Sequence, residues 1–150
     1  MLTIKKVIDT LKKHKIRYSW DAEKHLPLEQ LGMGCYREVY AVEGLNVAVK
    51  FPLKGKGNLS HARHEMKALD RLAHSAPPEL RKHLPKVYWS DWKTGIIVMK
   101  KYRDSWAAGK KLSRMLADFF NTCPDYNDFR AGNFGRDSNN RLIILDLGLT

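Results

Sequence analysis

Apolar residues at the start of the chain recur at the spacing of one helical face. Ile4, Val7, Ile8 and Leu11 follow one another at intervals of three and four, and lysines occupy the other faces. This period predicts an amphipathic helix over residues 3–14. Its apolar stripe is short and contains no Trp or Phe, so packing on the protein's own core is favoured over binding to a membrane surface.

Between residues 28 and 53 the pattern changes to short segments typical of strands. REVYAV and NVAVKF are separated by Glu43-Gly44 and preceded by Gly32-Met33-Gly34. This arrangement predicts a meander of antiparallel strands. Two further strands are predicted in KVYWSDW and GIIVMKKY, and a turn at Lys93-Thr94-Gly95 joins them as a hairpin.

Two segments outside these strands have a helical period. HARHEMKALDRLAH follows the glycine-lysine linker KGKGN and ends before Pro77-Pro78. The segment 111–121 carries a broader apolar stripe, formed by Leu112, Met115, Leu116, Phe119 and Phe120. After it we expect a loop at 126–133, a short strand, a polar turn at 138–140 and the apolar strand LIIL, which leads into Asp146.

The composition limits the size and location of the protein. With 43% hydrophobic residues, 150 residues can bury one core but not two independent ones, which predicts a single domain. No apolar run is long enough to cross a bilayer, and the N-terminus lacks the continuous apolar block of a signal peptide. Only two cysteines are present, which suits a reducing compartment. We therefore expect a cytoplasmic protein.

The charge is strongly positive. Lys and Arg number 27 against 16 Asp and Glu, which gives a net charge of +11. Such a field attracts polyanions and phosphorylated ligands. Nucleic acid is therefore compatible as a partner, although neither an aromatic-interleaved RNA motif nor a zinc-finger spacing accompanies the charge. A basic surface that only contacts solvent and binds no polyanion explains the charge equally well.

A first group of candidate functional residues lies in LGMGCYREVY and in the VAVK segment that follows it. Gly32 and Gly34 permit a tight strand–turn–strand whose backbone N–H groups can approach phosphates. Val39 would cover a base, and Lys50 offers a point charge to phosphate oxygens. A glycine hairpin and an alternating strand are also common structural features, so this group alone is weak evidence.

Two further groups lie near the end of the sequence, in DFRAGN and in Asp146-Leu147-Gly148. Asp128 and Asn133 are five residues apart, and Asp146 follows thirteen residues later. A short hairpin would bring the two carboxylates and the amide together around a hard cation with oxygen ligands. Each residue taken singly is also an ordinary turn former.

Together, the motifs between residues 28 and 149 resemble those of the protein-kinase superfamily. That resemblance implies an α+β fold in one domain. After an N-terminal helix and lead-in at 1–27, an antiparallel N-lobe sheet with one C-helix would occupy 28–102. A strongly reduced helical C-lobe with the catalytic loop and Asp-Leu-Gly would occupy 103–150. The Ala-Gly-Asn ending of the loop is similar to bacterial small-molecule, lipopolysaccharide-sugar and RIO-type kinases.

The resemblance also implies which residues bind ATP. The nucleotide pocket would be formed by Gly32, Gly34, Val39, Ala48, Lys50 and Met99. The two glycines would lie over the phosphates, and Met99 would line the back of the adenine pocket beside a hinge at 100–102. Lys50 would contact the α- and β-phosphates and form an ion pair with Glu65 on the following helix.

The catalytic and metal-binding roles fall on the later motifs. By the resemblance, Asp128 positions or deprotonates the acceptor hydroxyl, and Arg130 lies near the transferred phosphate. Asn133 and Asp146 bind Mg²⁺. The implied cofactors are therefore ATP and Mg²⁺, with an acceptor that the sequence does not identify.

The sequence departs from the family pattern at several positions. Arg37 replaces the third glycine of the loop, Tyr126-Asn127 replace the usual His-Arg, and Leu147 replaces Phe. Only Leu149-Thr150 follow the Asp-Leu-Gly motif, with no activation segment after it. We therefore expect a miniature or C-terminally truncated member of the superfamily.

Three functions are compatible with these residues. The first is an ATP-dependent phosphotransferase that transfers the γ-phosphate to a hydroxyl of a protein or small molecule. The second is a catalytically inactive, pseudokinase-like regulatory module that binds nucleotide without turnover, and the third is a basic polyanion-binding protein. We favour the phosphotransferase because all the polar site residues are retained.

The apolar stripe of the helix at 111–121 also predicts a partner. Its width exceeds what one reduced layer of sheet and helix easily covers, and a large exposed apolar patch is unfavourable in a monomer. We expect a homodimer or a partner protein that covers this helix. The alternative is that the N-terminal helix at 3–14 covers it within the chain.

Overall fold

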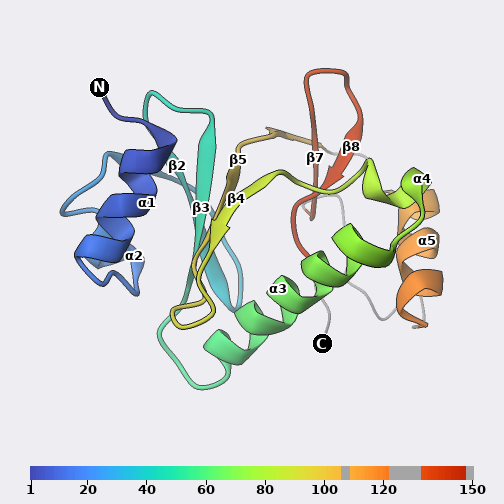
Figure 1. Cartoon of the computed structure of the whole chain (residues 1–150), viewed down its shortest axis with the longest axis horizontal. Helices are drawn as coiled ribbons and strands as arrows, with labels where there is room; N and C mark the ends of the chain where they lie inside the picture. The colour runs from blue at the N-terminus through green and yellow to red at the C-terminus, as the bar shows by residue number, and fades with distance from the viewer. Residues whose placement is uncertain (106–108, 122–132, 148–150) are drawn as a thin grey trace. The chain divides into compact units, whose positions relative to one another are not determined.

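A computed structural model describes residues 1–105, 109–121 and 133–147 of the chain (Figure 1). The described part is mixed α+β, which confirms the α+β class predicted from the sequence, whereas the likeness to a kinase fold stays a prediction. Its contacts divide the chain into an N-terminal unit, residues 1–63 with 86–101, and a C-terminal unit, residues 64–85 with 102–150. None of the described helices combines the length and the apolar character that a membrane span requires.

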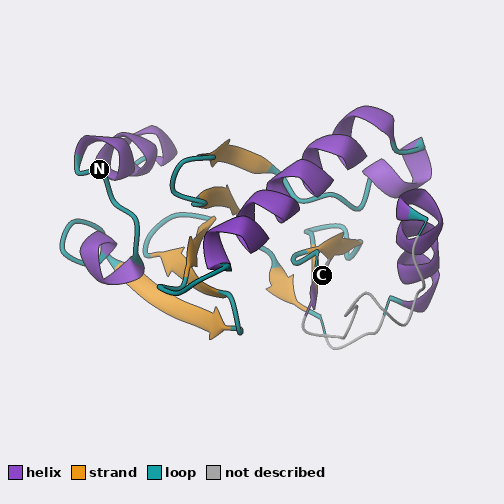
Figure 2. Cartoon of the chain, turned by 90° about the horizontal axis from the view of Figure 1, so that it is seen from below, coloured by secondary structure: helices purple, strands orange, loops and turns teal. Residues whose placement is uncertain are grey.

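The N-terminal unit is built on a five-stranded antiparallel sheet with the strand order β1-β2-β3-β5-β4. Figure 2 draws the strands in orange. The strands are β1 Leu28–Met33, β2 Arg37–Val42, β3 Val47–Pro52, β4 Val87–Ser90 and β5 Ile97–Lys100. The predicted meander and the predicted hairpin are therefore both confirmed. Two segments distant in sequence form one sheet because β3 pairs with β5.

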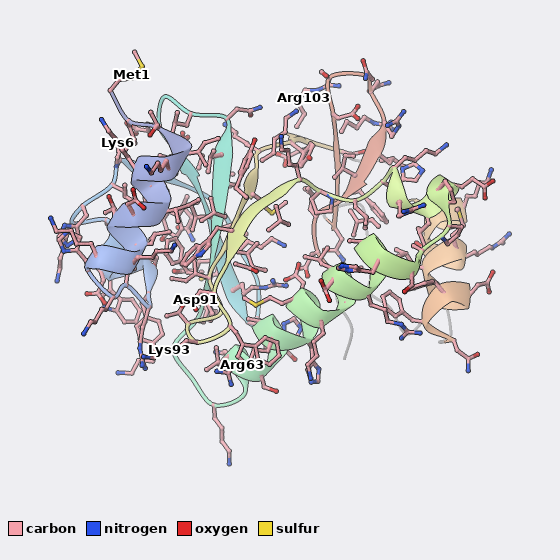
Figure 3. The ribbon with its side chains drawn as sticks, in the orientation of Figure 1. Met1, Lys6, Arg63, Asp91, Lys93 and Arg103 are labelled. Carbon is pink, nitrogen blue, oxygen red and sulfur yellow. The ribbon has the colours of Figure 1, made fainter. Side chains whose placement is uncertain are left out.

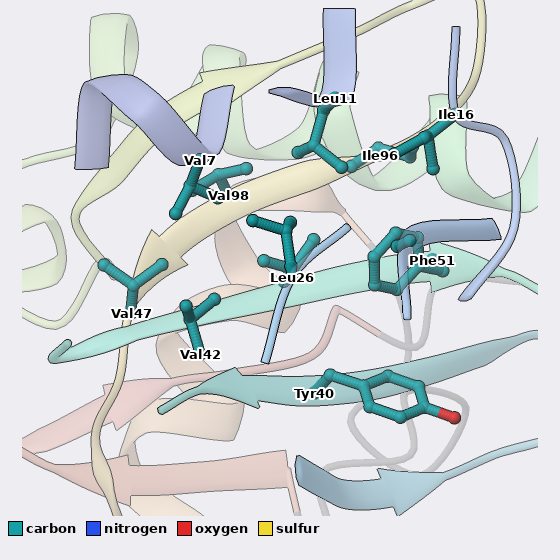
Figure 4. Close-up of a cluster of buried hydrophobic side chains, with 12 residues drawn as sticks. Val7, Leu11, Ile16, Leu26, Tyr40, Val42, Val47, Phe51, Ile96 and Val98 are labelled. Carbon is teal, nitrogen blue, oxygen red and sulfur yellow. The ribbon is translucent and has the colours of Figure 1, made fainter. Parts of the chain in front are cut away.

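Helix α1, Ile4–Lys13, packs on one face of this sheet (Figure 4). Thr3 caps it, since its Oγ1 accepts a hydrogen bond from the Lys6 backbone N–H at 3.2 Å. Val7 and Leu11 of α1 lie in the same buried cluster as Phe51 of β3. The predicted N-terminal helix and its packing on the core are confirmed.

A short helix, α2 Ser19–Ala22, follows α1 and was not predicted. The Ser19 hydroxyl donates a hydrogen bond to the Glu38 carboxylate on β2, and Ala22 is fully buried. These contacts tie the lead-in segment to the sheet. A helix of four residues has too few positions to display a period, which explains why the sequence pattern missed it.

Helix α3, Asn58–Ser75, begins in the N-terminal unit and belongs to the C-terminal unit from His64 onward. It starts three residues before the predicted His61, so the glycine-lysine linker is shorter than expected. The Asn58 side-chain amide explains the early start, because it donates to the Leu53 carbonyl at 2.9 Å and holds the loop against the first turn.

The C-terminal unit joins the rest of α3 to two more helices, α4 Pro78–Arg81 and α5 Lys110–Phe120. A three-stranded antiparallel sheet completes it, with the strands β6 Arg103–Asp104, β7 Phe134–Arg136 and β8 Leu142–Ile144 in that order. Its core contains Leu72, Leu116, Phe134 and Ile144, each at most 1% exposed. The sequence predicted β7, β8 and α5, but neither β6 nor α4.

Helix α5 buries most of its apolar stripe within its own unit. Leu112 and Leu116 are 4% and 0% exposed, and Phe119 and Phe120 are partly buried against the same core. The guanidinium of Arg71 lies over both rings, 5.0 and 5.4 Å from their centroids. The unit's own residues therefore supply much of the cover that the sequence assigned to a partner, and the homodimer stays a prediction.

The turn at 91–95 between β4 and β5 depends on a glycine (Figure 3). The Asp91 carboxylate accepts from the Lys93 backbone N–H at 3.1 Å and from the Thr94 hydroxyl at 2.8 Å. Gly95 has a φ of +78°, and a Cβ there would lie 2.7 Å from Cγ of Pro52 on β3. The turn thus requires glycine for both conformation and close packing.

Gly95→Ala should lower the free energy of unfolding by about 2–4 kcal/mol, because a strained backbone and a steric clash add together. Urea denaturation measures the change. Gly44→Ala is the matched control: Gly44 has a φ of +81°, but a Cβ there meets no atom within 4 Å. It should cost only about 1 kcal/mol from backbone strain. Equal losses in the two variants would rule out the clash.

Candidate functional site

The nucleotide-binding residues predicted from the sequence lie on one face of the sheet in the N-terminal unit. Val39 of β2 pairs with Lys50 of β3, and Ala48 of β3 pairs with Met99 of β5. Directly paired residues point to the same face of a sheet, and residues two apart in a strand do so as well. All four side chains therefore share the face opposite α1, and Gly32 extends the row because it pairs with Val39.

The two glycines of the β1–β2 hairpin are not required by the packing of the described residues. Neither has a positive φ, and a Cβ at Gly32 would meet no described atom within 4 Å. At Gly34 the nearest atom is the Arg37 carbonyl oxygen at 4.0 Å, which accepts a hydrogen bond from the Gly34 N–H at 2.8 Å. The backbone at Gly32 consequently faces open space, which leaves room for a ligand to approach it.

The residues after the glycines anchor the hairpin to α3, a contact that the sequence did not predict. The Tyr36 ring stacks on His61, with centroids 4.0 Å apart and planes 12° from parallel. The Tyr36 carbonyl accepts from the Leu53 N–H at 2.9 Å. Arg37, which replaces the third glycine, is only 5% exposed, so its side chain packs inward. The hairpin is therefore held on the β2 side of its turn.

Lys50 and Glu65 are two of the few buried charged residues among those described. Lys50 is 5% exposed on β3, and Glu65 is 2% exposed on α3 in the C-terminal unit. Charged side chains are rarely buried unless a polar or ionic partner compensates for the lost hydration. The ion pair between Lys50 and Glu65 stays a prediction.

Asn133 and Asp146 lie side by side in the C-terminal unit. Asn133 precedes β7 and Asp146 follows β8, and the pairing of Phe134 with Ile144 brings the two positions together. The Asn133 carbonyl accepts from the N–H groups of Leu145 at 2.8 Å and Asp146 at 3.4 Å. The short hairpin expected from the sequence therefore does bring the backbones of Asn133 and Asp146 into contact. Their role as Mg²⁺ ligands stays a prediction.

The remaining predicted residues, Asp128 and Arg130, lie outside the described residues. Among those that are described, no group of three or more His, Cys, Asp and Glu side chains is placed to hold a metal ion. The predicted set needs no such group, because it combines the Asn133 amide with carboxylates. Oxygen ligands of this kind are the type that Mg²⁺ prefers, so Asn133 and Asp146 fit the metal chemically.

No protein-family model and no curated protein sequence matches this chain. Function is therefore inferred from the geometry of its own residues. Within the described residues, two of the predicted groups are each brought together by strand pairing: the row from Gly32 to Met99 in one unit, and Asn133 with Asp146 in the other.

Gly32→Ala should weaken binding of Mg-ATP by roughly tenfold, or about 1.4 kcal/mol. The added methyl group would fill the space expected to receive a phosphate, yet it meets no described atom of the protein. Stability should stay the same or rise by about 0.5 kcal/mol, because glycine is unfavourable in a strand. Calorimetric titration and urea denaturation measure the two effects.

Gly44→Ala is again the control and should behave in the opposite way. It places the same methyl group in the β2–β3 turn at a positive φ. It should therefore lose stability and keep its affinity for Mg-ATP. Wild-type affinity in the Gly32→Ala protein would contradict a phosphate position beside this strand.

Proposed function

We propose that the protein is a Mg-ATP-dependent phosphotransferase of kinase-like fold, which transfers the γ-phosphate to a hydroxyl group. The observation that carries this proposal is the shared sheet face of Val39, Ala48, Lys50 and Met99, beside the open backbone of Gly32. Helix α3 follows β3 in the chain, where the resemblance expects the C-helix, and it carries Glu65. The shared face of the four side chains follows from strand pairing, independently of the motifs themselves.

Each residue of the row has a distinct task in this proposal. The adenine ring packs against the apolar side chains of Val39 and Met99, and the small Ala48 leaves room for it between them. Lys50 supplies a positive charge to the phosphates, and its burial strengthens the interaction because little water screens it. Phosphoryl transfer depends mainly on such positioning and electrostatic stabilisation.

The residues of the C-terminal unit complete the proposed chemistry. Asn133 and Asp146 hold Mg²⁺, which neutralises charge on the phosphates when it is bound. Asp128 accepts the proton of the acceptor hydroxyl, and Arg130 stabilises charge on the transferred group. The adjacent positions of Asn133 and Asp146 support this division of roles.

Asp128→Asn should lower phosphate transfer and hydrolysis from γ-³²P-labelled ATP by about 100-fold or more, because a positioned general base contributes at least that factor. Mg-ATP affinity should change by less than about threefold, since the amide keeps the shape of the side chain. Asp146→Ala should instead weaken Mg-ATP binding itself. Scintillation counting of labelled protein and of released phosphate, together with calorimetry, measures these effects.

Asp118→Asn removes an exposed carboxylate from α5 and should leave both measurements unchanged. Wild-type protein that binds Mg-ATP and shows no more turnover than Asp128→Asn would be a nucleotide-binding regulatory module. Wild-type protein that does not bind Mg-ATP at all would refute the proposal.

Polyanion binding is a second candidate function, favoured by the charge of the N-terminal unit. This unit has 16 Lys and Arg against 7 Asp and Glu, so it holds nine of the eleven net positive charges. The exposed Trp20 stacks on Tyr18, and His14 stacks on His25, with centroids 4.5 and 3.7 Å apart. Desolvation lowers the pKa of His14, and the neighbouring His25 and Lys13 lower it further.

Trp20→Ala should lower the affinity for a single-stranded oligonucleotide by about fivefold or more, because a base that stacks on an aromatic ring contributes about 1–3 kcal/mol. Fluorescence anisotropy at several salt concentrations measures affinity and its salt dependence. Trp92→Ala is the control, since the two rings are 47% and 48% exposed. Equal effects of the two variants, or affinity independent of salt, would argue against this function.

A further inference from the structure

A cavity of about 670 Å³ opens in the C-terminal unit, away from any residue assigned above. It lies between α4 with the residues just after it, the first turns of α5, and the start of β8. Figure 1 labels these three elements. Pockets for small molecules commonly have volumes of about 300–1,000 Å³. The cavity is therefore large enough for a small organic ligand.

The charged side chains that line the cavity are mostly positive. Lys82, Lys110 and Lys111 are accompanied by a single carboxylate, that of Glu79. The unit as a whole has 11 Lys and Arg against 9 Asp and Glu, and outside the cavity it has 8 of each. The net charge of the unit is thus concentrated in this lining and does not reflect a generally basic surface.

The three lysines are available to a ligand. Among the described residues, no carboxylate forms an ion pair with Lys82, Lys110 or Lys111. Lysines that share one cavity without paired carboxylates repel one another, and an anion between them relieves that repulsion. The lining therefore favours an anionic ligand.

His83 adds a hydrogen-bonding group whose orientation is fixed. Its Nδ1 lies 2.6 Å from the Leu142 carbonyl oxygen, and a carbonyl oxygen only accepts, so Nδ1 carries the hydrogen and donates it. The backbone holds the residue as well, since the His83 carbonyl accepts from the Ile144 N–H at 2.9 Å. Nε2 is then the ring nitrogen without a hydrogen, so it can accept a hydrogen bond from a hydroxyl or amide group of a ligand in the cavity.

The rest of the lining is apolar. Leu112 is 4% exposed, and Met115 and Leu142 are partly buried against the core of the unit. These side chains offer a wall against which a carbon skeleton can pack, beside the charged groups. A simple inorganic ion would leave this wall in contact with water.

We propose that this cavity binds a small molecule that carries a phosphate group on an apolar body. Three lysines and one glutamate give the lining a net charge of +2, which matches the charge of about −2 on a phosphomonoester at neutral pH. The lysines hold the phosphate, and the apolar wall holds the rest of the ligand. This site does not depend on the phosphotransferase function.

Phenyl phosphate is a suitable probe, because it combines a phosphomonoester with an apolar ring. Calorimetric titration of the full chain should show that it binds more tightly than inorganic phosphate, and that phenol does not bind. Lys82→Gln and Lys111→Gln should each weaken its binding roughly five- to tenfold, because each removes one charge-assisted contact to the phosphate. Both lysines are exposed, so the variants should fold normally, which thermal denaturation checks.

Each variant has a nearby control: Arg81 adjoins Lys82 at the end of α4, and Arg114 lies on α5 with Lys111. Arg81→Gln and Arg114→Gln remove one positive charge from α4 and α5 at residues outside the lining, and they should change affinity by less than about twofold. Equal losses in both pairs would show that the probe senses only overall charge and would overturn the site. The site would also be overturned if phenyl phosphate at millimolar concentration did not bind to the wild-type protein.

Lys50→Met separates this site from the proposed nucleotide site. The variant should lose affinity for Mg-ATP and keep its affinity for phenyl phosphate. If it loses both, the probe occupies the nucleotide site and the cavity assignment is wrong. If the wild-type protein binds phenyl phosphate but not Mg-ATP, the proposed function fails while the cavity site stands.

Discussion

The side chains of β3 alternate between two faces, and the N-terminal unit is organised around this alternation. Val47, Val49 and Phe51 are fully buried in the core with α1, whereas Ala48 and Lys50 point to the opposite face. A shift of the strand by one residue would exchange the faces and move the Lys50 ammonium into the apolar core, at a cost of several kcal/mol. The packing of α1 thus fixes the register in which Lys50 pairs with Val39.

The buried charges of Lys50 in the N-terminal unit and Glu65 in the C-terminal unit are not explained by folding alone. Lys50 and Glu65 are almost completely buried, and each must lose hydration when the chain folds. Apolar residues of similar size at buried ionic positions are often neutral or stabilising. The chain therefore carries groups there that a stability requirement would not select, which agrees with a role in binding. Gly32 and Gly34, at the edge of the sheet, also agree with a role in binding, because the packing of the described residues does not require glycine at either position.

Periodicity in the sequence predicted the elements that are long enough to repeat. The N-terminal helix, the meander and the stripe of α5 each span several periods of the hydrophobic pattern. Where short loops connect successive strands, their antiparallel pairing follows. The two-residue β6 and the four-residue α2 and α4 have no such signal. The contact between Tyr36 and His61 joins residues 25 positions apart and depends on how the hairpin meets α3.

The parts of the candidate site that join residues close in sequence were predictable, and those that join distant segments were not. Spacing alone indicated that a hairpin would bring Asn133 to Asp146, because the two strands between them are local. The shared face of Ala48 and Met99 follows from the pairing of β3 with β5, which the sequence does not specify. The lysine-lined cavity combines α4, α5 and β8, so no single stretch of sequence contains it.

Arg71 determines how much of the apolar surface at the end of α5 faces water. Its guanidinium covers the two phenylalanine rings at the end of α5 and presents a charged surface where an oily one would otherwise face water. A planar, weakly hydrated cation is well suited to this place, since it stacks on rings while its edge stays solvated. One side chain outside the core thus reduces the apolar area that these two rings present to water.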